Sequence, residues 1–318
     1  SGGTNALDAV VIYEQARAGD SNWGFSVQNI VTHYVVGCGT DEQRERWLPG
    51  LASGEIVGAI AMTEPGTGSD LQSVKTTAVA DGDEYVLNGS KTFITNGQAA
   101  DIVIVVAKTG PESGARGISL VVVETADAEG FRRGRNLEKL GMKGQDTSEL
   151  FFDNVRVRAS NLLGGEPGQG FYQLMRQLPW ERLIIGISAV GMSDYAIEQT
   201  VDYVQNREAF GQRIMDFQNT RFKLAEAKTK LEVTRAFVNQ CIAQHDRGEL
   251  DAATGSMAKL WGSEVQNEIV DECLQLFGGY GYMAEYPISH LYRDARVQRI
   301  YGGTNEIMKE LIARDLDK

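Results

Sequence analysis

The spacing of apolar and polar residues divides the chain into three regions with different periods. Up to about residue 58 the apolar positions follow the helical period. Thr40-Asp41-Glu42-Gln43 has the sequence of a capping box, with Thr40 as the N-cap. We expect the helix that begins there to be short and to end before Pro49-Gly50. The first region is therefore predicted to be helical.

From residue 59 to 163 the period changes to two, with β-branched runs between turn residues. Such spacing is typical of antiparallel strands in a small sandwich or barrel. We expect turns at 81–83 and 88–89, an exposed loop in the basic run 132–135, and a hinge in the glycine-rich stretch 164–168. The expected strands are 74–80, 84–87, 91–95, 102–107, 118–123 and 149–157.

After residue 163 the helical period returns. One long helix should bury a seam with steps of three and four residues and stop at Gly248. A second should run over 252–276 and end at Gly278-Gly279, and helices of this length pack as a bundle. The predicted fold class is α+β: N-terminal helices in 1–58, a middle β-barrel or sandwich in 59–163, and a C-terminal four-helix bundle in 164–318. The seam consists of Phe217, Thr220, Leu224, Ala227, Leu231, Thr234, Val238 and Cys241.

Composition and charge exclude several functions. The 318 residues suggest about two domains, and the net charge of −12 argues against a nucleic-acid partner, which needs a basic surface. The cysteines Cys38, Cys241 and Cys273 are far apart and give neither a disulfide framework nor metal-ligand spacing, so no metal is expected. No apolar run reaches the length of about 18 residues that a membrane span needs.

Two glycine-rich stretches could approach a phosphate. Residues 279–284 match the string G-x-G-x-x-A, but they follow a predicted helix instead of a strand, which disfavours a dinucleotide-binding fold. Gly66-Thr67-Gly68-Ser69 follows the apolar run 56–62, so amides and hydroxyls would emerge at a strand end. An ordinary glycine turn explains the second stretch equally well.

Glu181 differs from the many solvated carboxylates of this acidic chain. It lies beside Trp180 in an apolar segment, where desolvation would raise a carboxyl pKa toward the range of a general base. A first-turn glutamate favoured by the helix dipole, or an ion pair with Arg182, fits the local sequence better. Nucleophile elbows, P-loops and H-E-x-x-H motifs are absent from the sequence.

Six motifs in order resemble those of the acyl-CoA dehydrogenase family, and the resemblance covers essentially the whole chain. It is closest to the long-chain branch, through 235–238 and 301–314. Family members usually carry further helix before the Gly2-Gly3 pair, so the resemblance implies an incomplete N-terminal domain. The motifs are 61–70 (AMTEPGTGSD), 93–97 (FITNG), 140–144 (LGMKG), 207–211 (REAFG), 275–281 (QLFGGYG), and 293–296 (RDAR) leading into 300–307 (IYGGTNEI).

The resemblance implies that the chain binds FAD, partly across a subunit interface. Phe93 stands where the family often has Trp, which keeps the aromatic plane and removes an N–H donor. The implied FAD contacts are Ile60, Ala61, Met62, Thr63, Gly68 and Ser69, then Phe93, Ile94 and Thr95, then Arg207, Gln218, Gln275, Leu276, Gly278 and Gly279, and finally Thr304, Asn305 and Glu306. The implied substrate contacts are Ser69, Leu178, Arg182, Tyr301 and Gly302.

Position 302 departs from the commonest family pattern. Many members carry their catalytic glutamate there, whereas this chain has Gly302. The isovaleryl-CoA and long-chain branches carry the base on a helix instead, in a segment that resembles 178–183, and Glu181 matches it. A glycine at 302 would leave room for that side chain. In the family, the backbone N–H at this position donates to the thioester oxygen.

The resemblance therefore implies an FAD-dependent dehydrogenase that converts a medium- to long-chain fatty acyl-CoA to trans-2-enoyl-CoA and passes its electrons to an electron-transfer flavoprotein. It also implies a homo-oligomer, usually a tetramer. Bacterial cytoplasm and the mitochondrial matrix both suit the unpaired cysteines. An acyl-CoA oxidase or flavin monooxygenase on the same scaffold, or a non-catalytic subunit of a hetero-oligomer, are the alternatives.

Overall fold

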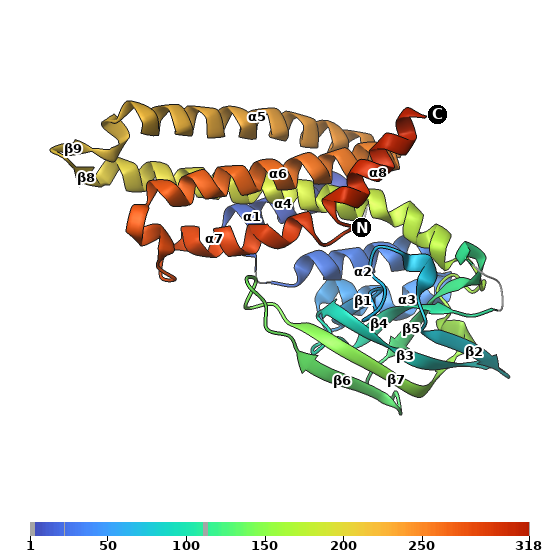
Figure 1. Cartoon of the computed structure of the whole chain (residues 1–318). Helices are drawn as coiled ribbons and strands as arrows, with labels where there is room; N and C mark the ends of the chain where they lie inside the picture. The colour runs from blue at the N-terminus through green and yellow to red at the C-terminus, as the bar shows by residue number, and fades with distance from the viewer. Residues whose placement is uncertain (1–3, 22, 111–113, 318) are drawn as a thin grey trace. The chain divides into compact units, whose positions relative to one another are not determined.

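The computed structural model describes residues 4–21, 23–110 and 114–317. The chain forms two compact units, which Figure 1 shows in colours that follow the sequence. The bundle unit contains the residues up to 21, residues 140–142 and the chain from 178 onward, and the sheet unit contains residues 22–139 and 143–177. Gly2 and Gly3 lie outside the described residues.

Three helices precede the sheet: α1 (Asn5–Arg17), α2 (Phe25–Cys38) and α3 (Asp41–Ser53). The capping box is confirmed, because the Thr40 hydroxyl accepts the Gln43 N–H and the Gln43 side chain accepts the Thr40 N–H. The early stop is wrong: α3 continues through Pro49 to Ser53 and is capped by Gly54, with φ +82°. Proline removes a single backbone donor on an exposed face, while burial of Trp47 and Leu51 keeps the helix in place.

The seven-stranded sheet has the order β1-β4-β2-β3-β7-β6, and β5 pairs with β4. β1 pairs with β4 in parallel, so the expectation of an entirely antiparallel sheet is wrong. In β4, Ile102, Ile104 and Val106 face a core shared with α2 and α3, and the alternate residues face a second core. This burial on both faces explains the unbroken apolar runs in the sequence. The strands are β1 (Gly58–Ala61), β2 (Thr77–Asp81), β3 (Glu84–Thr95), β4 (Ile102–Lys108), β5 (Ile118–Glu124), β6 (Phe131–Asn136) and β7 (Thr147–Arg158).

Two local expectations in this sheet are wrong. Asn88-Gly89 is no turn, because β3 runs through it with a register shift. A Cβ at Gly89 would lie 2.8 Å from the Thr76 Cα, so glycine there permits a close backbone approach. The basic run 132–135 is part of β6, which ends the sheet. Charged side chains are a common protection of such an edge strand.

The bundle unit consists mainly of long helices, which run side by side in Figure 1. The predicted seam of α5 is confirmed: Thr220, Leu224, Ala227, Leu231 and the remaining members to Cys241 are buried, and Phe217 is the N-cap. None of the helices among the described residues is long and apolar enough to cross a membrane. The helices are α4 (Gly170–Asn206), α5 (Gln218–Asp246), α6 (Ala252–Leu276), α7 (Pro287–Ala295) and α8 (Asn305–Leu316), and a ribbon of β8 (Glu208–Ala209) and β9 (Gln212–Arg213) joins α4 to α5.

Glycines bring α4 and α6 into close contact. A Cβ at Gly262 would lie 3.1 Å from the Gly186 Cα, and a Cβ at Gly255 would lie 3.1 Å from the Pro179 Cα. Side chains at these positions would push the two helices apart. The glycines therefore hold the segment around Glu181 against α6.

Candidate active site

Glu181 lies well inside α4 and not at a helix start. The helix begins at Gly170, so the interpretation of Glu181 as a first-turn glutamate is wrong. Its side chain is buried at 8% exposure, beside Leu178 and next to Trp180, whose ring stacks on His245 at 4.6 Å between centroids. The helix passes through Pro179, which hid this continuity in the sequence.

Arg182 is buried beside Glu181 and extends toward α6. Burial lowers the pKa of Arg182, and the negative charge of Glu181 offsets only part of this shift, so the net pKa is lowered. One guanidinium nitrogen donates to the Ser256 hydroxyl at 3.2 Å, whereas Nε has no hydrogen-bond partner in the described part of the chain. A buried, unsatisfied donor leaves Arg182 able to bind an added acceptor.

Gly302 belongs to the loop before α8 and faces α4. It has φ +66°, and a Cβ there would lie 2.7 Å from the Ile185 Cδ1. Ile185 follows Glu181 by four residues, so both side chains lie on the same face of the helix. No acceptor for the Gly302 N–H is found among the described residues. The loop thus places the Gly302 backbone beside the helix face that carries Glu181.

The rest of this loop connects to α8. Thr304 is the N-cap of α8, and Asn305, its first residue, is 3% exposed. Glu306 is exposed, and Tyr301 retains 37% of its surface. The structure therefore brings the predicted residues 301–306 together with Glu181 and Arg182 in one unit.

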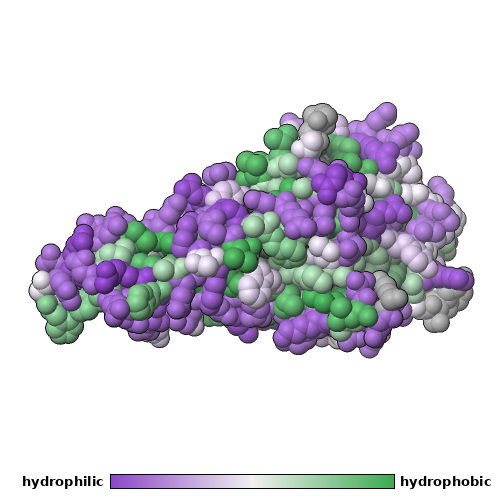
Figure 2. Space-filling view, turned by 90° about the horizontal axis from the view of Figure 1, so that it is seen from above, coloured by the Kyte–Doolittle hydropathy of each residue, from purple (hydrophilic) through white to green (hydrophobic). Residues whose placement is uncertain are grey.

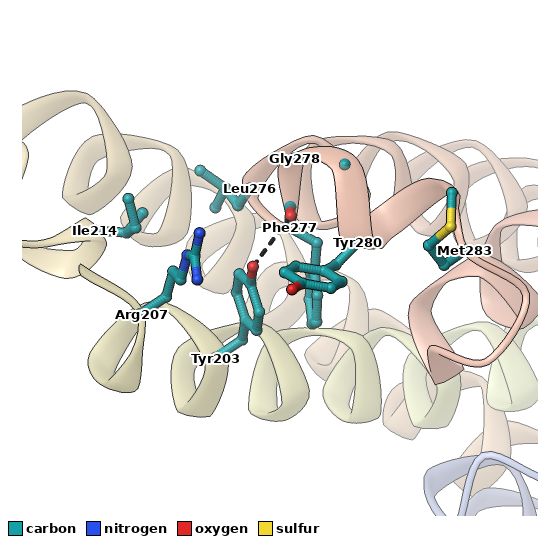
Figure 3. A pocket seen from close by; sticks show the side chains of 9 residues that line it. Tyr203, Arg207, Ile214, Leu276, Phe277, Gly278, Tyr280 and Met283 are labelled. Carbon is teal, nitrogen blue, oxygen red and sulfur yellow. Dashed lines mark hydrogen bonds between the residues drawn. The ribbon is translucent and has the colours of Figure 1, made fainter. Parts of the chain in front are cut away.

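A second group of predicted residues lines a cavity of about 470 Å³ (Figure 3). The Arg207 guanidinium carbon lies 5.8 Å from the centroid of the Tyr280 ring, and Tyr203 stacks on Phe277 at 4.2 Å. Cβ atoms at Gly278 and Gly279 would meet nothing within 4 Å, so this backbone borders open space. The lining residues are Tyr203, Arg207, Ile214, Leu276, Phe277, Gly278, Gly279, Tyr280 and Met283.

Two predicted residues lie outside that lining. Gln218 is the first residue of α5, and Gln275 is the next to last of α6; both are exposed. The 279–284 string follows a helix and forms a 3₁₀ turn, so it is not the start of a strand–turn–helix unit. The cavity nevertheless offers a cation, aromatic rings and approachable backbone, which suit a nucleotide pyrophosphate.

The sheet unit brings its own predicted residues together. Thr92 N donates to the Thr63 carbonyl at 2.9 Å, which joins the turn after β1 to the end of β3. Phe93 has φ +60° and is 67% exposed, an unusual backbone for a bulky residue. The residues so joined are Ile60, Ala61, Met62 and Thr63 with Phe93, Ile94 and Thr95; Gly68 and Ser69 follow on the exposed turn.

A buried ion pair holds this turn. The Lys91 ammonium is fully buried and donates to Glu64 at 2.9 Å and to the Met62 carbonyl at 3.0 Å. Glu64 also accepts the Lys75 and Thr76 N–H groups at 2.7 and 2.9 Å. Burial raises the pKa of Glu64, but these hydrogen bonds outweigh it, and the net pKa is lowered. Burial lowers the pKa of Lys91 to about 8.

Glu64→Gln should reduce stability in a pH-dependent way. Because the folded pKa lies below the unfolded value, the carboxylate stabilises the fold above about pH 4.3, and this contribution is lost as the pH falls toward the folded pKa. We expect a loss of about 3 kcal/mol in unfolding free energy at neutral pH, shrinking in acid. Urea unfolding at about pH 7 and pH 3.5 measures it. Glu55→Gln, at an exposed carboxylate, is the control, and an equal loss at both pH values would contradict the assignment.

Sequence reasoning missed the buried lysines Lys91 and Lys259. Lys259 lies on the packed face of α6 with Ser256, Gly262 and Ser263, all of which are buried. The sequence does contain a signal for Lys259: it lies three or four residues from small residues on the same face of the helix. A solvated lysine would lie on the opposite face.

Comparison with known proteins identifies the fold and then the family. A solved acyl-CoA dehydrogenase from Geobacillus kaustophilus superposes with a TM-score of 0.96 at 48% identity, covering 99% of this chain and 83% of that one. Butyryl-CoA dehydrogenase from Megasphaera elsdenii gives 0.95 at 35% identity, covering 100% and 83%. The predicted α+β fold, with helices on either side of a β region in the sequence, is thereby confirmed.

Three family models match successive parts of the chain: the acyl-CoA dehydrogenase N-terminal domain at residues 1–55, the middle domain at 59–155 and the C-terminal domain at 168–316. The pig protein named long-chain specific acyl-CoA dehydrogenase, mitochondrial, is 52% identical over 318 residues, which are 99% of this chain and 74% of the relative. The chain therefore belongs to the acyl-CoA dehydrogenase family, whose members are FAD-dependent oxidoreductases.

Proposed function

We propose that this protein is an FAD-dependent acyl-CoA dehydrogenase that converts a medium- to long-chain fatty acyl-CoA to its trans-2-enoyl-CoA, with Glu181 as the base. The observation that carries the proposal is the placement of Gly302, whose N–H has no acceptor among the described residues, beside the face of α4 that bears buried Glu181. The 52% identity to a long-chain relative supports the acyl length.

The reaction removes one proton and one hydride from the substrate, which together are two protons and two electrons. The Glu181 carboxylate takes the α-proton, and the Gly302 N–H donates to the thioester oxygen, which gains negative charge as that proton leaves. The Cα–Cβ double bond forms as the β-hydrogen departs as hydride. FAD, when bound, supplies the hydride acceptor. Burial of Glu181 excludes water from the carboxylate and favours the proton transfer.

Each unit, taken by itself, carries groups that suit FAD. In the bundle unit Arg207, Gly278 and Gly279 would hold the pyrophosphate, and Thr304, Asn305 and Glu306 would lie over the cofactor. In the sheet unit the exposed ring of Phe93 offers a flat apolar surface for the isoalloxazine, with Thr95 as a hydrogen-bonding neighbour. Leu178, Arg182 and Tyr301 would contact the acyl thioester, and exposed Ser69 the CoA moiety.

We infer a homo-oligomer, with a tetramer as the expected form. Large apolar side chains are exposed on the bundle unit: Phe210 at 96%, Phe222 at 58% and Trp261 at 47%. Figure 2 shows hydrophobic areas among a mainly hydrophilic surface. Burial of such residues between subunits would stabilise an oligomer. The expected electron acceptor is an electron-transfer flavoprotein, and the expected compartment is bacterial cytoplasm or mitochondrial matrix.

Anaerobic titration of the FAD-loaded protein with saturated acyl-CoAs of increasing length tests the proposal. We expect the oxidised-flavin absorbance to bleach, and most completely with medium and long chains. Bleaching by none of them would contradict the proposed reaction, and fast turnover with oxygen alone would favour an oxidase or monooxygenase. A protein that takes up no FAD would instead be a non-catalytic subunit.

A further inference from the structure

A buried lysine anchors the loop that presents the Gly302 amide. The Lys259 side chain on α6 is fully buried, and its ammonium donates to the Gly303 carbonyl at 2.7 Å and to the Asn305 side-chain oxygen at 2.6 Å. The Lys259 ammonium thus binds the loop at two residues, one on each side of Thr304 in the sequence.

Asn305 extends this anchor. Its amide nitrogen donates to the Ser263 hydroxyl at 3.0 Å and to the Glu264 carboxylate at 2.8 Å, both on α6. Glu264 is in turn paired with Arg299 at 2.7 Å, just before the loop. The start of α8 is therefore tied to α6 by fixed polar contacts, with Lys259 at the centre.

The loop needs such an anchor because of its backbone. Gly302 and Gly303 are adjacent and both have positive φ, at +66° and +90°. Glycine restricts φ and ψ less than any other residue, so side-chain sterics alone would leave the direction of the Gly302 N–H poorly fixed. A hydrogen bond to the Gly303 carbonyl removes much of that freedom one residue away from the amide.

Lys259 lies among charged groups as well as being buried. Burial, first of all, and the charge of Arg182 lower the pKa of Lys259, whereas Glu306 and Glu264 raise it, and the net pKa is about 8. Arg182 reaches the same part of α6 through Ser256. Keeping an ammonium here is costly, and a purely structural contact between α6 and α8 could be apolar.

We propose that Lys259 is a positioning residue for the dehydrogenation: through the Gly303 carbonyl and Asn305 it holds the Gly302 N–H in the direction needed to stabilise the negative thioester oxygen. The inference rests on the proposed function. In this role Lys259 affects the rate of α-proton removal although its own side chain does not contact the substrate.

The test isolates α-proton removal from hydride transfer. A 3-thiaacyl-CoA has sulfur in place of the β-carbon, so its α-protons can exchange with solvent deuterium while no hydride can leave. Exchange is followed by mass spectrometry in the FAD-loaded protein, and the affinity for the analogue is measured by calorimetry. We expect Lys259→Met to slow exchange at saturating analogue about tenfold or more and to leave the dissociation constant within about threefold.

Controls separate positioning from folding. Lys230→Met removes an exposed lysine paired with Glu268 on the bundle surface and should leave exchange unchanged. If Lys259→Met does not retain FAD, Lys259→Gln, which keeps an uncharged donor, is measured instead, with a smaller loss expected. Exchange within about twofold of wild type in the folded variant would overturn the inference, as would a loss that merely follows analogue affinity.

The two proposals can fail separately. Wild-type protein that binds the analogue without exchanging its protons, and that acyl-CoAs do not bleach, would contradict the dehydrogenase itself, and the role of Lys259 with it. Wild-type exchange that Glu181→Gln abolishes and Lys259→Met leaves intact would retain the dehydrogenase and remove the positioning role alone.

Discussion

Replacing Glu181 by glutamine should reduce the rate of flavin bleaching by acyl-CoA by at least about 10²–10⁴-fold. Glutamine has nearly the same shape and cannot take the α-proton, so binding and folding should change little. Anaerobic stopped-flow with a saturating acyl-CoA measures the bleaching rate, and the dissociation constant of the enoyl-CoA product reports binding. The loss should appear in the rate and not in the affinity.

Glu198→Gln is the matched control, because Glu198 is a half-exposed glutamate on the same helix, paired with Arg17 on the surface. It should bleach at the wild-type rate. Full activity of Glu181→Gln would show that another group removes the proton, and the assignment of the base would be wrong.

Gly302→Ala should lower the bleaching rate by about 10²–10³-fold, the cost of losing one well-placed donor to a developing oxyanion. Its Cβ would lie 2.7 Å from the Ile185 Cδ1, and alanine disfavours the φ of +66°. Relief of either strain requires the backbone at 302 to shift, which changes the position and direction of the Gly302 N–H. Because α-proton removal depends on that donor in the proposed mechanism, solvent exchange with the 3-thiaacyl-CoA should slow in parallel.

Gly248→Ala is a control that separates the steric clash with Ile185 from the cost of a positive φ in alanine. Gly248 has φ +70°, and a Cβ there would meet nothing within 4 Å, so this variant carries the φ cost alone and should keep full activity. Ile185→Val removes the Cδ1 atom and should restore part of the rate in the Gly302→Ala background. Wild-type activity of Gly302→Ala alone would exclude the backbone at 302 as the critical donor.

Local signals predicted much of the fold. The capping box at Thr40 and the seam of α5 depend on residues three or four apart, and both are confirmed. The parallel pairing of β1 with β4 joins Gly58 to Ile102, and no local pattern specifies such a distant partner. The sequence predicts a turn at Gly89 and not a strand, because the close approach of Thr76 that requires glycine there is likewise a contact that no local pattern specifies.

The boundaries of the three expected domains stay a prediction. Compactness groups α1 with the C-terminal helices, because Tyr13 donates to Asp194 at 2.6 Å and Arg235 contacts both side chains. These contacts span more than 180 residues of sequence from Tyr13, so they were not predictable from periodicity.

The candidate site was predictable mainly through the family motifs. Composition and periodicity alone favour a structural role for Glu181, as a first-turn glutamate or in an ion pair with Arg182. Only the order of the family motifs, together with glycine at 302, indicates a catalytic base on the helix. The burial of Lys91 and Lys259 was not predicted, because lysine is normally exposed. Their hydrogen-bond partners Glu64 and Asn305 also lie 27 and 46 residues away in the sequence.

The glycine contacts between α4 and α6 restrict how this enzyme could acquire new substrates. A Cβ at positions 186, 255 or 262 would already lie about 3.1 Å from backbone of the facing helix, so larger side chains require the helices to shift and random mutagenesis should recover few active variants there. Adaptation to longer or branched acyl groups would instead accumulate at residues that can change size without shifting α4. The location of Glu181 would then remain constant while the shape of the proposed acyl-binding region diverged.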